Sequence, residues 1–79
     1  INRTIADPAK AIRQVKQHYE AEALAIDEID GISMEFTDWR FNLRMSNTEP
    51  VVRFNVETRG DRELLEQRQN EVLAILEAQ

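Results

Sequence analysis

The sequence contains no cysteine, which excludes a disulfide scaffold and any metal site built on thiolates. It also lacks any apolar run near the ~20 residues that a membrane-spanning helix needs, and no signal-peptide pattern opens it. These absences fit a reducing compartment and a protein without a membrane partner. We therefore expect a cytoplasmic protein.

Positive charge is also scarce, because 10 Lys and Arg residues stand against 15 Asp and Glu residues, for a net charge of −5. A field of this sign repels phosphate-bearing ligands, so any anion site must come from a local arrangement of donors. The one histidine, His18, falls on a lysine-rich helix face. There we expect a solvated surface residue with no catalytic role.

The chain is short, and its 79 residues allow one domain with a thin core. It begins at Ile1 rather than at Met, which suggests a piece of a longer protein. We treat residues 1–79 as one domain of that protein.

Two helices are predicted from their caps and their apolar spacing. Asp7 is a suitable N-cap followed by Pro8 at the first helical position, and this helix should end between Glu20 and Glu22. Asp61 can cap a second helix over residues 62–77. The apolar stripes are Ile12, Val15 and Tyr19 in the first helix, and Leu64, Leu65, Val72, Ile75 and Leu76 in the second, where the stem of Arg68 fills a gap.

Four strands are predicted between the helices, because apolar and polar residues alternate there. Residues 1–5 are compatible with a further short strand, Asp30-Gly31 supplies a turn, and Thr37-Asp38 leaves room for a tight hairpin that puts Glu35 opposite Arg40. The sequence thus predicts an α+β fold, a two-layer antiparallel sheet of four to five strands with two helices on one face. The residues expected to face the core are Leu24, Ile26, Ile32, Met34, Phe36, Trp39, Phe41, Leu43, Met45, Val52, Phe54 and Val56.

The candidate site lies between the third and fourth of these strands. The guanidinium of Arg44 offers a planar fork of donors that matches two phosphate oxygens. Ser46 and Thr48 add hydroxyl donors, and Asn47 adds an amide. These residues predict a phosphate-binding loop, although such residue types are common near turns, so an ordinary hairpin loop is an equal alternative on this ground alone.

The residues that follow are expected to support the site. Pro50 can start a strand without an amide donor and holds Glu49 extended. Glu49 should not touch phosphate, because like charges repel. We expect it to pair with Arg44 or Arg53. For Arg53, pairing with Glu49 or Glu57 is favoured over direct attraction of phosphate.

The run Arg44-Met45-Ser46-Asn47-Thr48-Glu49-Pro50 resembles the signature of the C-terminal domain of the α-D-phosphohexomutases. The segments 30–36 and 39–43 are similar to bacterial phosphomannomutases in particular, and the resemblance extends from about Ile1 to the end. It implies the fourth domain of such an enzyme, with a fold like that of the TATA-box-binding protein, in the order strand, helix, four strands, helix. The predicted elements agree with this order if residues 1–5 form the first strand.

The resemblance implies that the loop grips the phosphate that is not being transferred, while the domain swings to close the active-site cleft. The partners would be a hexose phosphate and the other three domains of the enzyme. A phosphomannomutase would interconvert mannose 6-phosphate and mannose 1-phosphate. The same domain of a phosphoglucomutase or of a dual-specificity mutase is the alternative. Phosphoryl transfer would use a phosphoserine in the first domain and a magnesium ion held by aspartates in the second.

Neither of those catalytic motifs occurs in this sequence. Its only serines, Ser33 and Ser46, do not lie in a Ser-His-Asn-Pro context, and no Asp-Gly-Asp-x-Asp loop occurs. We therefore expect no catalytic residue and no metal ligand within residues 1–79.

A more remote alternative is a non-enzymatic module that binds nucleic acid or protein. The acidic net charge opposes binding to nucleic acid. The aromatic residues Trp39, Phe41 and Phe54 are in phase with the expected core, so they are not predicted to stack on bases.

Overall fold

The chain folds into five strands and two helices, in a computed structural model that describes residues 1–29, 31–46 and 48–78. The elements are β1 (Asn2–Thr4), α1 (Pro8–Tyr19), β2 (Ala25–Asp27), β3 (Ile32–Glu35), β4 (Trp39–Met45), β5 (Val51–Thr58) and α2 (Arg62–Glu77). This order confirms the predicted α+β architecture, with residues 2–4 as the first strand.

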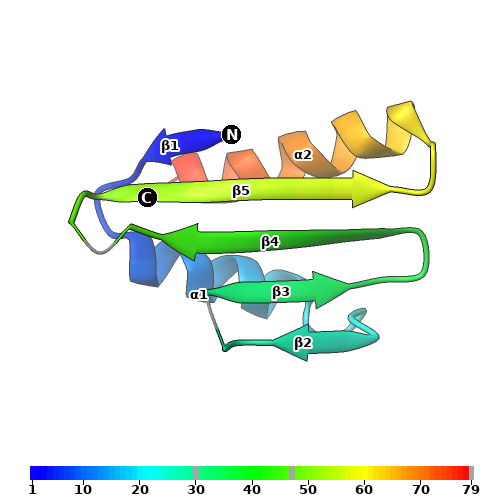
Figure 1. Cartoon of the computed structure of the whole chain (residues 1–79), viewed down its shortest axis with the longest axis horizontal. Helices are drawn as coiled ribbons and strands as arrows, with labels where there is room; N and C mark the ends of the chain where they lie inside the picture. The colour runs from blue at the N-terminus through cyan, green and yellow to red at the C-terminus, as the bar shows by residue number, and fades with distance from the viewer. Residues whose placement is uncertain (30, 47, 79) are drawn as a thin grey trace.

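The strands form one antiparallel sheet in the order β1-β5-β4-β3-β2. Both helices lie behind this sheet in Figure 1, where they cover one face and leave the other open. Helix α1 packs against α2 and β4, and α2 packs against β5. The domain therefore has two layers, and its core lies between them.

Both helices begin where the sequence predicts. The Asp7 carboxylate accepts a hydrogen bond from the Lys10 amide at 3.2 Å, and Pro8 is the first helical residue. The Asp61 carboxylate accepts from the Leu64 amide at 3.0 Å. Each cap satisfies an amide that has no partner within its helix, so these residues fix where the helices start.

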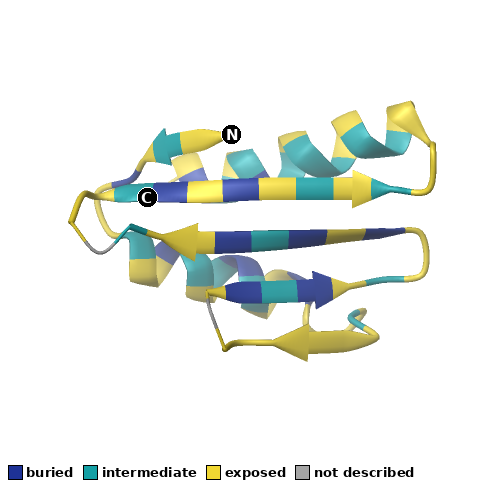
Figure 2. Cartoon of the chain, in the orientation of Figure 1, coloured by how far each residue is buried: buried dark blue, intermediate teal, exposed yellow. Residues whose placement is uncertain are grey.

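The core follows the alternation of the strands, which Figure 2 shows as buried residues separated by exposed or intermediate ones along β4 and β5. All of its buried members are apolar or aromatic. This confirms the prediction that the aromatic residues of β4 and β5 are core residues. The buried set is Ile5, Ala11, Val15, Tyr19, Ile32, Met34, Trp39, Phe41, Leu43, Val52, Phe54, Val72 and Leu76.

Three residues expected in the core are instead exposed. Leu24 is 71% exposed, Ile26 is 40% exposed and Met45 is 50% exposed. Ile26 has the predicted phase, since it is paired with the buried Met34. The prediction of burial was wrong because the two helices pack over the central strands. Strand β2 lies at the edge of the sheet, and Met45 is the last residue of β4.

A polar cluster joins the two helices beside the core. The Tyr19 hydroxyl and Arg68 Nη1 each donate to Glu71 Oε1 at 3.0 Å. The Arg68 guanidinium carbon lies 5.0 Å from the centre of the Trp39 ring, so this side chain fills the gap in the stripe of α2. Burial raises the pKa of Glu71, but the hydrogen bonds from Arg68 and Tyr19 outweigh it and hold the pKa below its usual value.

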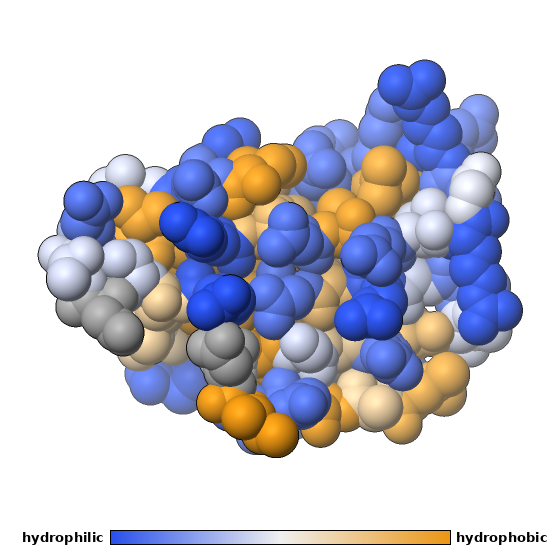
Figure 3. Space-filling model, viewed as in Figure 1, coloured by the Kyte–Doolittle hydropathy of each residue, from blue (hydrophilic) through white to orange (hydrophobic). Residues whose placement is uncertain are grey.

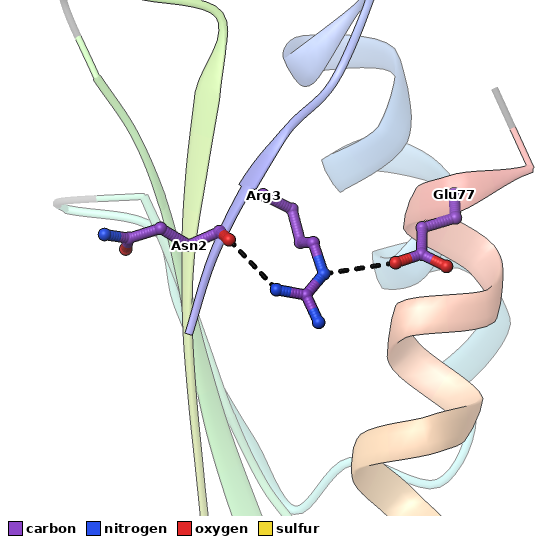
Figure 4. A network of polar contacts seen from close by, with 3 residues as sticks. All are labelled: Asn2, Arg3 and Glu77. Carbon is purple, nitrogen blue, oxygen red and sulfur yellow. Dashed lines mark hydrogen bonds and ion pairs between the residues drawn. The ribbon is translucent and has the colours of Figure 1, made fainter.

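The first strand is tied to the end of the last helix, as Figure 4 shows. Arg3 Nε donates to Glu77 Oε1 at 3.1 Å, and Arg3 Nη1 donates to the Asn2 carbonyl at 3.1 Å. The Asn2 side chain points away from Arg3 and from α2 in this view. Asn2 therefore belongs to the open face of the sheet.

Candidate functional site

The predicted phosphate-binding residues lie where β4 ends and β5 begins. The Ser46 amide donates to the Val51 carbonyl at 3.0 Å, which closes the connection between the two strands. The Ile5 amide donates to the Pro50 carbonyl at 2.8 Å, so the segment after β1 holds the end of the loop. Asn47, the fourth predicted ligand, lies outside the described residues.

Arg44 is exposed on the open face of the sheet. It is the second-last residue of β4, and its neighbour Leu43 is fully buried on the opposite face. Alternation along the strand therefore turns Arg44 away from the core. Figure 3 shows that this open face is largely hydrophilic.

Gly31 lies so close to β4, beside Arg44, that a side chain would not fit at this position. Its φ of +74° lies in the left-handed region that favours glycine, as a turn here requires. A Cβ at this position would collide with the Leu43 carbonyl and come within 3.1 Å of Arg44 Cγ. Asp30, the other half of the predicted turn, lies outside the described residues.

The Ser46 hydroxyl organises the start of the loop. Its oxygen accepts hydrogen bonds from the amides of Thr48 and Glu49, both at 3.3 Å, and lies 3.4 Å from Thr48 Oγ1. A hydroxyl that accepts two bonds still has its proton to donate. Ser46 and Thr48 thus bring two hydroxyl groups and two amides together beside the strand that carries Arg44.

The two residues expected to support the site do not make the predicted contacts among the described residues. Glu49 and Arg53 are exposed, and their side chains form no ion pair or hydrogen bond with any residue that the structure describes. Arg53 lies directly opposite Arg44 in the pairing of β5 with β4. The pairing of Arg53 with Glu49 or Glu57 is therefore not observed across the described ranges.

The other end of the open face is charged differently. The Arg40 guanidinium lies 3.9 Å from a carboxylate oxygen of Glu35 and 3.9 Å from one of Glu57, which confirms the predicted pairing with Glu35. A surface pocket at this end includes these three residues and Asp38 in its lining. Since acidic groups outnumber basic ones there, this pocket suits a phosphate less well than the loop does. His18 is exposed, as predicted.

The described parts of the chain contain no group of three or more His, Cys, Asp or Glu side chains that could hold a metal ion. No helix in those same parts is both long and apolar enough to cross a bilayer. The aromatic side chains lie on the side of the helices: Tyr19, Trp39, Phe41 and Phe54 are buried and Phe36 packs against them. The open face therefore offers bases no aromatic surface on which to stack.

Two features of the site could not be read from the sequence. The contact of Gly31 with Arg44 depends on the pairing of β3 with β4, and the opposition of Arg44 and Arg53 depends on the register of β4 with β5. The alternation of polar residues gave the face of each arginine. It did not give the register between strands.

Comparison with known proteins gives consistent matches over nearly the whole chain. Residues 1–75 match the family model described as phosphoglucomutase/phosphomannomutase, C-terminal domain. A phosphomannomutase of Escherichia coli K12 is 60% identical over 96% of the chain, and phosphohexose mutases of Xanthomonas campestris are 50% identical over 96%. A phosphomannomutase of Methanocaldococcus jannaschii is 35% identical over 84% of the chain. The chain spans 17%, 17% and 14% of the length of these relatives.

Proposed function

The chain belongs to the family of phosphoglucomutase/phosphomannomutase C-terminal domains, and from this membership we propose that it binds the substrate phosphate in a phosphomannomutase. The full-length enzyme interconverts mannose 6-phosphate and mannose 1-phosphate by intramolecular phosphoryl transfer. Arg44, Ser46, Asn47 and Thr48 hold the phosphate that is not transferred.

The observation that carries this proposal is the gathering of donors beside Arg44. Ser46 Oγ accepts from the amides of Thr48 and Glu49, which fixes the start of the loop, and it lies 3.4 Å from Thr48 Oγ1, so the loop donors offered to a ligand are the Ser46 and Thr48 hydroxyl groups. Arg44 supplies the charge and a fork of donors for two phosphate oxygens. A phosphate that approaches this end of the open face meets these donors, although the net charge of the chain is −5.

The contribution to the reaction is to bind and orient the substrate. A phosphate held at a fixed distance from the reacting one places the sugar for transfer, and its binding energy can drive closure of the cleft. Groups of the other three domains carry out the transfer. In this proposal a magnesium ion, which would neutralise phosphate charge when bound, belongs to another domain of the full-length enzyme. We place the enzyme in the cytoplasm.

Substitution of Arg44 in the full-length enzyme tests the proposal. A charge-assisted bidentate contact contributes on the order of 2–3 kcal/mol, so Arg44→Ala should lower kcat/KM roughly 30- to 150-fold. Arg44→Lys should restore part of this loss, because an ammonium group keeps the charge but lacks the fork. Steady-state kinetics with mannose 1-phosphate and glucose 1-phosphate give both the effect and the sugar preference.

Arg13→Ala is the matched control, because Arg13 is an exposed arginine on α1, on the helical side of the domain. It should leave kcat/KM unchanged. An Arg44→Ala enzyme that is folded and has normal kcat/KM would show that the loop is structural. Equal efficiency with glucose 1-phosphate would favour the dual-specificity alternative, which the combined name of the family keeps open.

A further inference from the structure

The two edges of the sheet differ in the side chains that they expose. At the edge formed by β1, Arg3 bonds to Glu77 of α2, so a charged pair protects this edge. At the edge formed by β2, the exposed side chains include Leu24, Ile26 and Ile29, which we call the apolar edge. Figure 3 shows apolar surface along the side of the molecule where β2 lies in Figure 1. Soluble proteins usually cover or charge such an edge, because it would otherwise associate with other chains.

The apolar edge continues the core beyond the reach of the helices. Ile26 is paired with Met34, which is fully buried, so Ile26 faces the same side of the sheet as the core. Helix α1 packs against α2 and β4, and α2 packs against β5, which leaves Ile26 exposed. An apolar surface placed against β2 on this side would complete the layer and remove these side chains from water, which is favourable.

Two contacts of the segment after β2 hold Ile29 in an exposed position. Its side chain is 92% exposed, so it contributes almost nothing to the core. Asp27 Oδ1 accepts a hydrogen bond from the Ile29 amide at 2.9 Å, and Glu28 pairs with Lys16 of α1 at 3.1 Å. A segment that is already fixed loses less conformational entropy when a partner covers it. An apolar side chain presented in this way is typical of a contact surface.

The apolar edge also lies close to the phosphate-binding end of the sheet. Ile29 is two residues before Gly31, so their Cα atoms are at most about 7 Å apart. Gly31 in turn lies against the backbone of β4 at Leu43 and Arg44. A body that covers Ile29 would therefore lie beside the end of the sheet that carries Arg44.

The size of the apolar edge favours a partner that belongs to the same polypeptide. Interfaces between separate proteins bury about 1,200–2,000 Å² and involve roughly 20–30 residues on each side, far more than three side chains supply. A partner within one chain needs less area, because the chain keeps the two surfaces at a high local concentration. The domain spans 17% of the length of its Escherichia coli relative, so most of such an enzyme lies outside these residues.

We propose that the apolar edge is the surface through which this domain contacts another domain of the same polypeptide when the cleft closes over the substrate. The inference rests on the proposed function, because the bound phosphate drives closure there. The contact buries Ile29 in the closed enzyme and leaves it exposed in the open one. The partner surface presents apolar side chains of its own to Leu24, Ile26 and Ile29.

Thiol labelling of the full-length enzyme tests the inference. The 79 residues contain no cysteine, so Ile29→Cys adds one thiol to this domain, and its modification by a maleimide can be followed from the mass of its peptide. Saturating mannose 1-phosphate should slow this modification roughly fivefold or more, because the closed state then predominates. Asn70→Cys is the matched control, since Asn70 is exposed on α2, which packs against β5. Its labelling rate should not change.

Steady-state kinetics of the full-length enzyme give a second measurement. Ile29→Ser should lower kcat/KM roughly 10- to 50-fold, because it removes apolar area that is buried only in the closed state. Ile29→Val keeps most of that area and should lose at most about fourfold. Since Ile29 is exposed in the open domain, neither variant should lower the melting temperature of the unliganded enzyme.

The possible results separate this inference from the proposed function. Labelling of Ile29→Cys that mannose 1-phosphate does not slow, beside a lowered kcat/KM of Arg44→Ala, would overturn the inference and leave the proposed function standing. Normal kcat/KM of Arg44→Ala, with position 29 still shielded by the substrate, would overturn the role of Arg44 and leave the contact standing. Shielding that is lost when the enzyme is diluted would identify a second copy as the partner and refute the inference. Normal kcat/KM of Ile29→Ser would refute it as well.

Discussion

Gly31 should be far less tolerant of substitution than the other glycine, and the structure allows the reason to be isolated. Gly31 and Gly60 have nearly the same backbone angle, with φ of +74° and +77°. A Cβ on Gly31 would collide with the Leu43 carbonyl and crowd Arg44, whereas a Cβ on Gly60 would meet nothing within 4 Å. The two alanine variants therefore share the cost of the backbone conformation and differ in the collision.

The expected loss of stability follows from three contributions. An L-residue in the left-handed region costs about 1–2 kcal/mol, which is partly offset by the reduced entropy of the unfolded chain, about 0.4–1 kcal/mol. These two contributions apply to both glycines and leave Gly60→Ala destabilised by about 0–1.6 kcal/mol. Displacement of the backbone at Gly31 adds roughly 1–3 kcal/mol. Gly31→Ala should thus lose about 1–4.6 kcal/mol, which is about 1–3 kcal/mol more than Gly60→Ala, out of a total stability on the order of 4–12 kcal/mol for 79 residues.

Urea and thermal unfolding of the 79-residue chain measure the difference. At roughly 4–8 °C per kcal/mol for a domain of this size, Gly31→Ala should lower Tm by about 4–24 °C more than Gly60→Ala does. Equal losses in the two variants would refute the argument, since the contact with β4 would then contribute nothing beyond the backbone angle. The two variants can be compared if Gly31→Ala still unfolds in a cooperative urea transition, because the variant is then folded and only less stable.

Two further predictions concern stability. The pKa of Glu71 is lower in the folded chain than its ordinary value of 4.5, because Tyr19 and Arg68 donate to the ionised carboxylate. These bonds therefore stabilise the fold at pH values above 4.5, and this stabilisation is lost as the pH falls through the pKa of the folded state. Unfolding followed from pH 6 to pH 3 should therefore show a shallower decline for Glu71→Gln, and an unchanged slope would contradict this. Leu43→Ala removes a fully buried side chain and should cost about 2–5 kcal/mol in denaturant titration, with a loss below 1 kcal/mol as the refuting result.

Local chemistry made the elements predictable from the sequence. Asp7 with Pro8, and Asp61, mark the starts of both helices, because a cap acts on amides only three residues away. The alternation in β3, β4 and β5 gave their buried faces, since the pleat requires it. The gathering of Arg44, Ser46 and Thr48 at the end of β4 was predictable for the same reason, because these residues lie close together along the chain.

Long-range placement could not be read from the sequence in the same way. Leu24 and Ile26 have the pattern of a buried strand, yet they are exposed because β2 became an edge strand that the helices do not cover. Which side chains of a strand share a face is a local property, but whether that face is buried depends on where the helices pack. A prediction of burial from alternation therefore holds only for strands that lie beneath a helix.

The sequence by itself determined the elements, their order and the loop that resembles the phosphohexomutase signature. Only the tertiary structure decided which side chains oppose each other across the sheet. Arg44 and Arg53 are nine residues apart in the chain, and the register of β4 with β5 makes them neighbours on the open face. A shift of one residue would have turned Arg53 toward the core. The physical reason is that register is set by the burial of Leu43 and Phe54 together, a paired contact that neither strand specifies alone.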